Sequence, residues 1–457
     1  MSSMSTLPPL SASFWSLTLA LCCALPGVAR AELPRLTVKD AVELALRRHP
    51  SLRVATEGTE AARARVGQAE AGYLPRVFAG AQWLGGTING NATSFIGFPD
   101  MPRIAGSKPN KNASDYALWG NYLVGLSTGV PIYDFGRTGG RVGEARFNVR
   151  EQEAGERLAR ERVVFGVRRA YFATLLASGT VKVAEESVER LAKYAAQAAA
   201  MVKQGIRRPI EVSRTQAEVA RAQVRLVSAR NELAVSRVVL DNAIGVRTEG
   251  RLELVPDLTE ERFTAALPAL LTLALDGRPE LAEVKERLQS FRSRLDSVKG
   301  NYLPILSATA SVNMRGVGGV GNYLNYDAGM LLTWPLFEGN LYKKQEEELY
   351  ARLRGLDAGA QELLQRIELE VRAAFAQAKS SEEFKRAAQV AFTHARENLN
   401  LAQESYNRGL TTVVELADAA ELFLVSQINV VRSGYELKIA LAAVERAVGQ
   451  PVPASGP

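Results

Sequence analysis

The stretch from Tyr302 to Met314 reads YLPILSATASVNM, and its pattern decides the fold. After Ile305, small or polar residues alternate strictly with apolar ones. The two sets are Ser307, Thr309, Ser311 and Asn313 against Leu306, Ala308, Ala310, Val312 and Met314. Because successive side chains of a strand point to opposite faces, this alternation predicts a β-strand with one apolar face.

Two further segments alternate in the same way. Ala328, Met330, Leu332 and Trp334 oppose Asp327, Gly329 and Thr333, while Tyr122, Val124, Leu126 and Val130 oppose Asn121, Gly125, Ser127 and Gly129. Strands of about ten residues with one apolar face are typical of a transmembrane β-barrel, with lipid outside and water inside. A soluble, half-buried hairpin shows the same alternation. Aromatic residues beside the strands favour the membrane: Trp83, Trp119, Tyr122, Trp334 and Phe337.

The chain also contains an internal duplication. Tyr73-Leu74-Pro75 precedes the first predicted hairpin as Tyr302-Leu303-Pro304 precedes the second, at an offset of 229. Beyond the hairpins an offset of 204 holds, and it relates Pro131-Ile132-Tyr133-Asp134 to Pro335-Leu336-Phe337-Glu338, Gly205 to Gly409, and Glu211 to Glu415. A chance match would not keep one offset across separate anchors, so the fold is built from two similar halves.

The duplication gives a domain division. We expect a signal peptide over residues 1–31, a first repeat over 32–245 and a second repeat over 246–457. Each repeat begins with a helical stretch, at about 37–72 and 266–300, and continues with a β-hairpin, at about 76–134 and 305–338. Four strands cannot close a barrel, and an open sheet edge is not tolerated in lipid, so closure requires several copies of the chain.

Very long helices follow each hairpin. No proline occurs from Arg137 to Lys203 or from Leu341 to Arg408, which predicts helical rods about 100 Å long. Heptads follow in both copies: Val212, Val219, Leu226, Leu233 and Leu240, and Leu416, Phe423, Val430, Leu437 and Val444. A seven-residue repeat predicts coiled-coil packing against a neighbouring helix.

The N-terminus predicts export. Phe14 to Leu25 is a short apolar run, and Ala29-Arg30-Ala31 forms a small-x-small cleavage pattern. Residues 1–13 carry no Lys or Arg, which is atypical of a signal peptide. Lipid modification of Cys22 or Cys23 is the alternative, although Leu21 is bulky where a small residue is usual. No later segment is apolar enough for a transmembrane helix.

The composition leaves little material for chemistry. The 457 residues include two cysteines, both in the N-terminal run, and two histidines, His49 and His394, which we interpret as surface or packing residues. We therefore expect no enzyme activity, no cofactor and no metal site. The net charge of +7 comes from Lys and Arg mixed with Glu, which argues against nucleic-acid binding. Gly316 to Gly321 matches G-x-G-x-x-G, but a strand follows it, so we interpret it as a hairpin loop.

Together these residues resemble the TolC-type outer-membrane efflux family. The resemblance covers nearly the whole mature chain, and rests on the repeated YLP, the P-[IL]-[YF]-[DE] motif after each hairpin, and G-x5-[DE] in both copies. It implies a mainly α-helical fold in which a homotrimeric β-barrel in the outer membrane continues into a periplasmic helical barrel. It also implies docking to an inner-membrane pump through a periplasmic adaptor (membrane fusion protein). Such a protein is the passive exit duct of a tripartite efflux or type I secretion system.

A duct needs a constriction rather than a nucleophile. Glu415 and Asp418 lie three residues apart, so they share one helix face, and symmetry would stack them as two carboxylate rings that attract cations. The resemblance implies that these rings line a closed periplasmic aperture, and that Tyr406 and Glu211 belong to the network that keeps it shut. Relatives can carry Arg where this chain has Thr411, so the network is expected to be weaker or differently connected. The alternative is an ordinary helix start, where acids are favoured by the dipole.

Gly205 and Gly409 follow the long helices and are expected to be C-caps. The resemblance implies that these helix tips also meet the adaptor. A second hypothesis is a periplasmic coiled-coil adaptor or scaffold without a pore, which leaves the four alternating strands unexplained. An enzyme is the third and weakest. The cargo and the pump class are not readable from the sequence.

Overall fold

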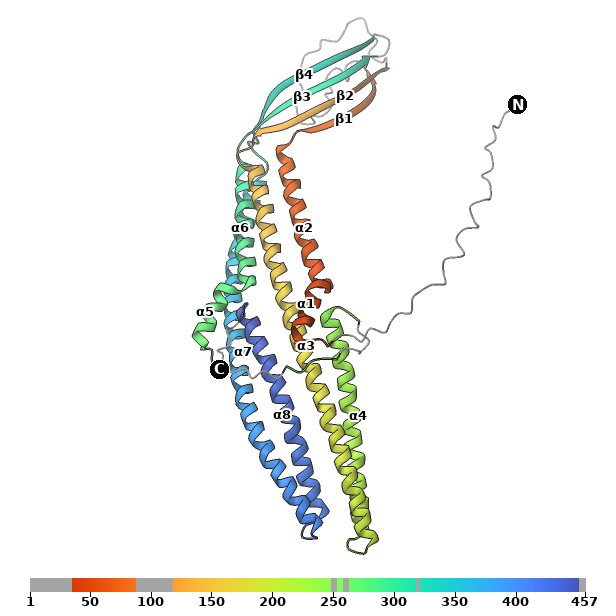
Figure 1. Ribbon diagram of the computed structural model, residues 1–457. Coiled ribbons are helices and arrows are strands. Elements are labelled where there is room, and N and C mark those ends of the chain that lie inside the picture. The colour runs from red at the N-terminus through yellow and green to blue at the C-terminus, as the bar shows by residue number, and fades with distance from the viewer. Residues whose placement is uncertain (1–34, 88–117, 248–252, 258–262, 318–320, 452–457) are drawn as a thin grey trace, which may run out of the picture.

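A computed structural model describes residues 35–87, 118–247, 253–257, 263–317 and 321–451. The expected signal peptide, with Cys22 and Cys23, lies outside these residues, as do residues 88–117 between the first two strands. Figure 1 shows a small sheet at one end of the molecule and two long helical hairpins that extend away from it. The described residues contain no helix that is both long and apolar enough to cross a membrane.

The element order of the first half recurs in the second. The first half contains α1 (Val38–Arg48), α2 (Pro50–Glu70), β1 (Arg76–Thr87), β2 (Leu118–Tyr133), α3 (Arg137–Lys203) and α4 (Ile210–Ile244). The second contains α5 (Leu267–Gly277), α6 (Pro279–Gly300), β3 (Ile305–Val317), β4 (Gly321–Thr333), α7 (Leu341–Asn407) and α8 (Val413–Val448). The predicted duplication and the mainly helical fold are confirmed.

Each repeat begins with two helices where the sequence pattern predicted one helical stretch. The break falls at His49 before Pro50 and at Arg278 before Pro279, and both preceding residues are extended, with ψ of 125° and 123°. A residue before proline is pushed out of the α region, while proline itself fits the first position of the next helix. The repeated proline therefore explains both breaks.

The four strands form one antiparallel sheet in the order β1-β2-β3-β4. The register pairs Ser127 with Ser311 and Ser311 with Asp327, and it pairs Leu126 with Val312. Polar residues of all three strands therefore share one face and apolar residues the other, as the alternation predicted. β1 and β4 are each paired on one side only among the described strands.

The sheet connects to the helices through left-handed backbone. Phe135 and Gly136 have φ of 53° and 86° before α3, and Gly339 and Asn340 have φ of 62° and 65° before α7. Arg137, which is buried, donates from Nε to the carbonyl of Gly300 at 2.9 Å. This bond joins the start of α3 in the first half to the end of α6 in the second.

Both rods have the predicted length, since α3 and α7 each contain 67 residues. The heptads behave differently in the two copies. On α8, Leu416, Phe423, Leu437 and Val444 are buried, because α8 packs on both α7 and α3. On α4 only Leu240 of the predicted line is buried, and the contact with α3 uses the smaller Thr215, Ala222 and Ala229 instead. Small residues allow a closer approach, and they leave a valine-rich face of α4 exposed: Val224, Val227, Val235, Val238 and Val239.

Candidate functional site

The far ends of the two hairpins carry matching turns (Figure 1). Gly205 follows α3 and Gly409 follows α7, with φ of 76° and 79°. In each turn the next residue closes a six-residue hydrogen bond: Ile206 N–H donates to Met201 O and Leu410 N–H to Ser405 O, both at 2.9 Å. This is the Schellman arrangement, in which glycine supplies the left-handed residue at low cost. Both glycines are therefore helix caps, and their side-chain positions face open space.

Tyr406 and Glu211 meet across the two hairpins. The Tyr406 hydroxyl, from the last turn of α7, donates to Glu211 Oε2 in the first turn of α4 at 3.2 Å. The Tyr406 side chain is almost fully buried, at 1% exposure. Burial, followed by the negative charge of Glu211, raises the pKa of the Tyr406 hydroxyl, so it remains a hydrogen-bond donor at neutral pH.

Arg207, which no sequence motif singled out, belongs to the same cluster. Its guanidinium lies 4.8 Å from the centroid of the Tyr406 ring, and Nη1 lies 3.8 Å from Glu211 Oε1. Nη2 donates to the carbonyls of Tyr406 at 3.2 Å and Thr411 at 3.0 Å. The duplication could have identified Arg207, because the offset of 204 relates it to Thr411, the position at which relatives can carry Arg.

Glu415 and Asp418 lie apart from this hydrogen-bonded cluster. Both are exposed, and they occupy the first two turns of α8. The Thr412 hydroxyl caps that helix by accepting from the Glu415 N–H at 3.4 Å. Neither carboxylate makes a hydrogen bond or an ion pair with the described residues of this chain. Both are therefore available to solvent, to ions or to other chains.

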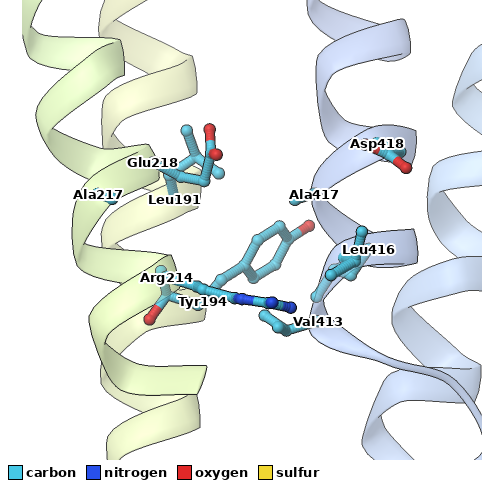
Figure 2. Close-up of a pocket in the computed structure, with 11 residues that line it drawn as sticks. Leu191, Tyr194, Arg214, Ala217, Glu218, Val413, Leu416, Ala417 and Asp418 are labelled. Carbon is cyan, nitrogen blue, oxygen red and sulfur yellow. The ribbon is translucent and has the colours of Figure 1, made fainter. Parts of the chain in front are cut away.

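A cavity of about 260 Å³ separates the two hairpins just above the turns. Figure 2 shows Tyr194 and Arg214 projecting into it from one side and Val413 and Leu416 facing them from α8. Tyr194 is buried and donates its hydroxyl to Gln403 Oε1 at 3.0 Å. Asp418 lines the same cavity. The two hairpins are therefore in contact at the turns, through the hydrogen-bonded cluster, and are separated by the cavity next to the Asp418 carboxylate.

The described residues offer no cluster of three or more His, Cys, Asp or Glu that could hold a metal ion. The chemistry of this end of the molecule consists of two buried tyrosines, Tyr194 and Tyr406, the hydrogen-bonded Arg207 guanidinium and exposed carboxylates. A sheet with one apolar face, joined to helical hairpins of this length, is the architecture that the sequence pattern predicted for an outer-membrane channel.

The chain belongs to the outer membrane efflux protein family, whose profile matches residues 41–246 and 270–450. The protein is therefore an outer-membrane protein whose helical part extends into the periplasm. The outer membrane protein TolC of Salmonella enteritidis is 22% identical over 441 residues, which cover 89% of this chain and 84% of that protein.

Solved structures show the same fold. A membrane protein from Pseudomonas aeruginosa has a TM-score of 0.77 at 19% identity, with 90% of each chain covered. The CmeC outer membrane channel of Campylobacter jejuni has a TM-score of 0.76 at 17% identity, with 92% of this chain and 87% of that chain covered. CmeC is an outer membrane channel.

Proposed function

We propose that this protein is the passive exit duct of a tripartite efflux or type I secretion system. The observation that carries the proposal is the sheet. It has one apolar face and two edges, β1 and β4, that are unpaired among the described strands. Unpaired edges are forbidden in lipid, so other copies of the chain must pair with them. Three copies would supply twelve strands, enough for a closed barrel.

The exposed valine face of α4 supports the same assembly. Val224, Val227 and Val238 are each about two-thirds exposed in the single chain. An apolar stripe of this kind on a long helix is typical of an interface. A neighbouring copy would cover it and extend the helical barrel around a central tunnel.

The periplasmic end is proposed to be the gate. Glu415 and Asp418 would form the two carboxylate rings, and the Tyr406–Glu211 hydrogen bond would hold the tip closed. The turns at Gly205 and Gly409 would meet the periplasmic adaptor, which links the duct to an inner-membrane pump. No catalytic step is needed, since the pump supplies the energy.

Single-channel conductance in planar bilayers tests this function. We expect small current steps from the wild type, and larger steps with weaker block by multivalent cations from the double variant Glu415→Ala/Asp418→Ala. The matched control is Glu397→Ala/Glu404→Ala, which removes two exposed carboxylates from α7 near the same end. This control should conduct as the wild type does.

Two outcomes would contradict parts of the proposal. A conducting wild type with an unchanged Glu415/Asp418 variant would keep the duct and move the gate elsewhere. No pore from correctly assembled protein would instead favour a coiled-coil scaffold, although that role leaves the apolar sheet face unexplained.

A further inference from the structure

Arg207 is the residue whose side chain reaches from one hairpin turn to the other. It belongs to the α3–α4 turn, and its Nη2 donates to one carbonyl in the last turn of α7, that of Tyr406, and to one in the α7–α8 turn, that of Thr411. The side chain is only 14% exposed although it lies at the end of the molecule. A largely buried guanidinium at a tip is unusual, because arginine is mostly exposed unless it is paired.

The two carbonyl groups that accept from Arg207 are well placed to bind a positively charged donor. The Tyr406 carbonyl lies in the last turn of α7, where carbonyls have few helical partners and the helix dipole is negative. The planar guanidinium can donate to two carbonyls while it stacks on the Tyr406 ring, a geometry that lysine cannot reproduce. Glu211 completes the arrangement, since it contacts Arg207 with one carboxylate oxygen and accepts from the Tyr406 hydroxyl with the other.

The contact between the turns joins equivalent positions of the two repeats. Arg207 and Thr411 are equivalent positions of the two repeats, and Arg207 bonds directly to the Thr411 carbonyl. The two turns are therefore joined at equivalent positions by one cation, which only the first repeat carries. The threonine side chain of the second repeat is too short to return the contact.

We propose that Arg207 is the latch that holds the two hairpin turns of one protomer together and so sets how often the tip opens. The latch is not fully satisfied, because its Nε is buried without a hydrogen-bond partner among the described residues. A contact with one unmet donor is suited to a reversible closure. The effect on opening rests on the proposed function, whereas the joining of the turns does not.

A neighbouring arginine in the same turn provides the control for a general effect of charge. Arg208 is the next residue in the same turn and is exposed, and its side chain makes no hydrogen bond or ion pair with the described residues. Arg208→Ala removes the same charge from the same turn without touching the α7–α8 turn. A general electrostatic effect would appear in both variants, and a latch only in Arg207→Ala.

The first measurement is a distance that does not depend on conduction. Spin labels on the exposed residues Lys203 and Glu404, in full-length protein with Cys22 and Cys23 changed to Ser, report the separation of the hairpin ends by pulsed electron paramagnetic resonance. Labelled chains diluted with unlabelled ones give the distance within one protomer. Arg207→Ala and Arg207→Gln should lengthen and broaden the distribution, and Arg208→Ala should leave it unchanged. Unchanged helical circular dichroism in each variant shows that the chain is folded.

The second measurement is bilayer conductance of the same proteins. Loss of Arg207 should raise the fraction of time in the larger-conductance state roughly tenfold or more, as expected when hydrogen bonds to a charged group are lost. Unchanged label distances in both Arg207 variants would overturn the latch. Longer label distances without a change in conductance would support the joining of the turns by Arg207. The same result would overturn the role of Arg207 in opening the tip, and it would contradict the proposed gate. A wild-type protein that does not conduct would contradict the proposed function alone, because the label distances test the joining of the turns independently of conduction.

Discussion

At the scale of single residues, Glu161 is the carboxylate whose titration the fold changes most clearly. It lies on α3, and burial, followed by repulsion from Glu280, raises its pKa to about 7. The cations Arg278, Arg157 and Arg446 act in the opposite direction and do not cancel the effect. Glu280 Oε2 is itself buried without a hydrogen-bond partner among the described residues.

This pKa predicts a pH-dependent stability. The folded state binds the Glu161 proton more tightly than the unfolded chain does, so the contribution is fully present below pH 4.5 and is lost as the pH rises to about 7. Glu161→Gln should therefore stabilise the protein at pH 8, by on the order of 1 kcal/mol after solvent screening, and have little effect at pH 4.5. Thermal unfolding followed by circular dichroism in detergent measures both.

The control for this prediction is Glu57→Gln, which changes an exposed carboxylate on α2 that makes no ion pair with the described residues. It should give the same unfolding temperature as the wild type at both pH values. An equal shift for Glu161→Gln at pH 4.5 and pH 8 would contradict the assigned titration.

At the scale of elements, the turns at Gly205 and Gly409 decide how the rods end. Both residues have positive φ with open space around the missing side chain. A β-branched residue there costs roughly 1–2 kcal/mol from the backbone alone, whereas asparagine tolerates this conformation. Strain and tip docking can therefore be separated by choosing the substituted residue.

We expect Gly205→Val and Gly409→Val to impair export while the barrel still assembles. Gly205→Asn and Gly409→Asn are the controls, since they keep the left-handed turn, and they should export nearly as the wild type does. Export is measured in cells that depend on this duct, beside the amount of assembled protein in the outer membrane. Normal export by both valine variants would show that the tips do not meet a partner.

The sequence predicted the elements better than their contacts. The periodicities located β2, β3 and β4 and their faces, the duplication implied β1, and the absence of proline predicted the lengths of α3 and α7. The proline breaks at His49 and Arg278 were missed, although Pro50 and Pro279 are themselves related by the offset of 229. The burial of Thr215 and Ala222 in place of the larger heptad residues was also missed, because it depends on how many neighbours α4 has. Arg207 was missed because its partners lie about 200 residues away.

At the scale of the whole molecule, the single chain has the features expected of one subunit of a closed assembly. Its sheet has two edges, and its helices expose valines that a soluble monomer would bury. We expect the purified protein to have about three times the mass of one chain. Native mass spectrometry from detergent, with and without heating, measures this directly. A stable monomer that still shows the native helical spectrum would contradict the assembly.

The pairing of β2 with β3 has a consequence for how the protein is made. Ser127 and Ser311 are register partners 184 positions apart, so the sheet joins the two halves at its centre. The α3–α4 hairpin needs only neighbouring sequence, whereas closing a loop of that length carries a larger entropy cost and slows folding. The helices can therefore form during export, but the central strand pair cannot exist until β3 has crossed the inner membrane. We therefore expect membrane insertion to follow translocation, because a chain truncated before β3 would have the α3–α4 hairpin but only β1 and β2 of the sheet.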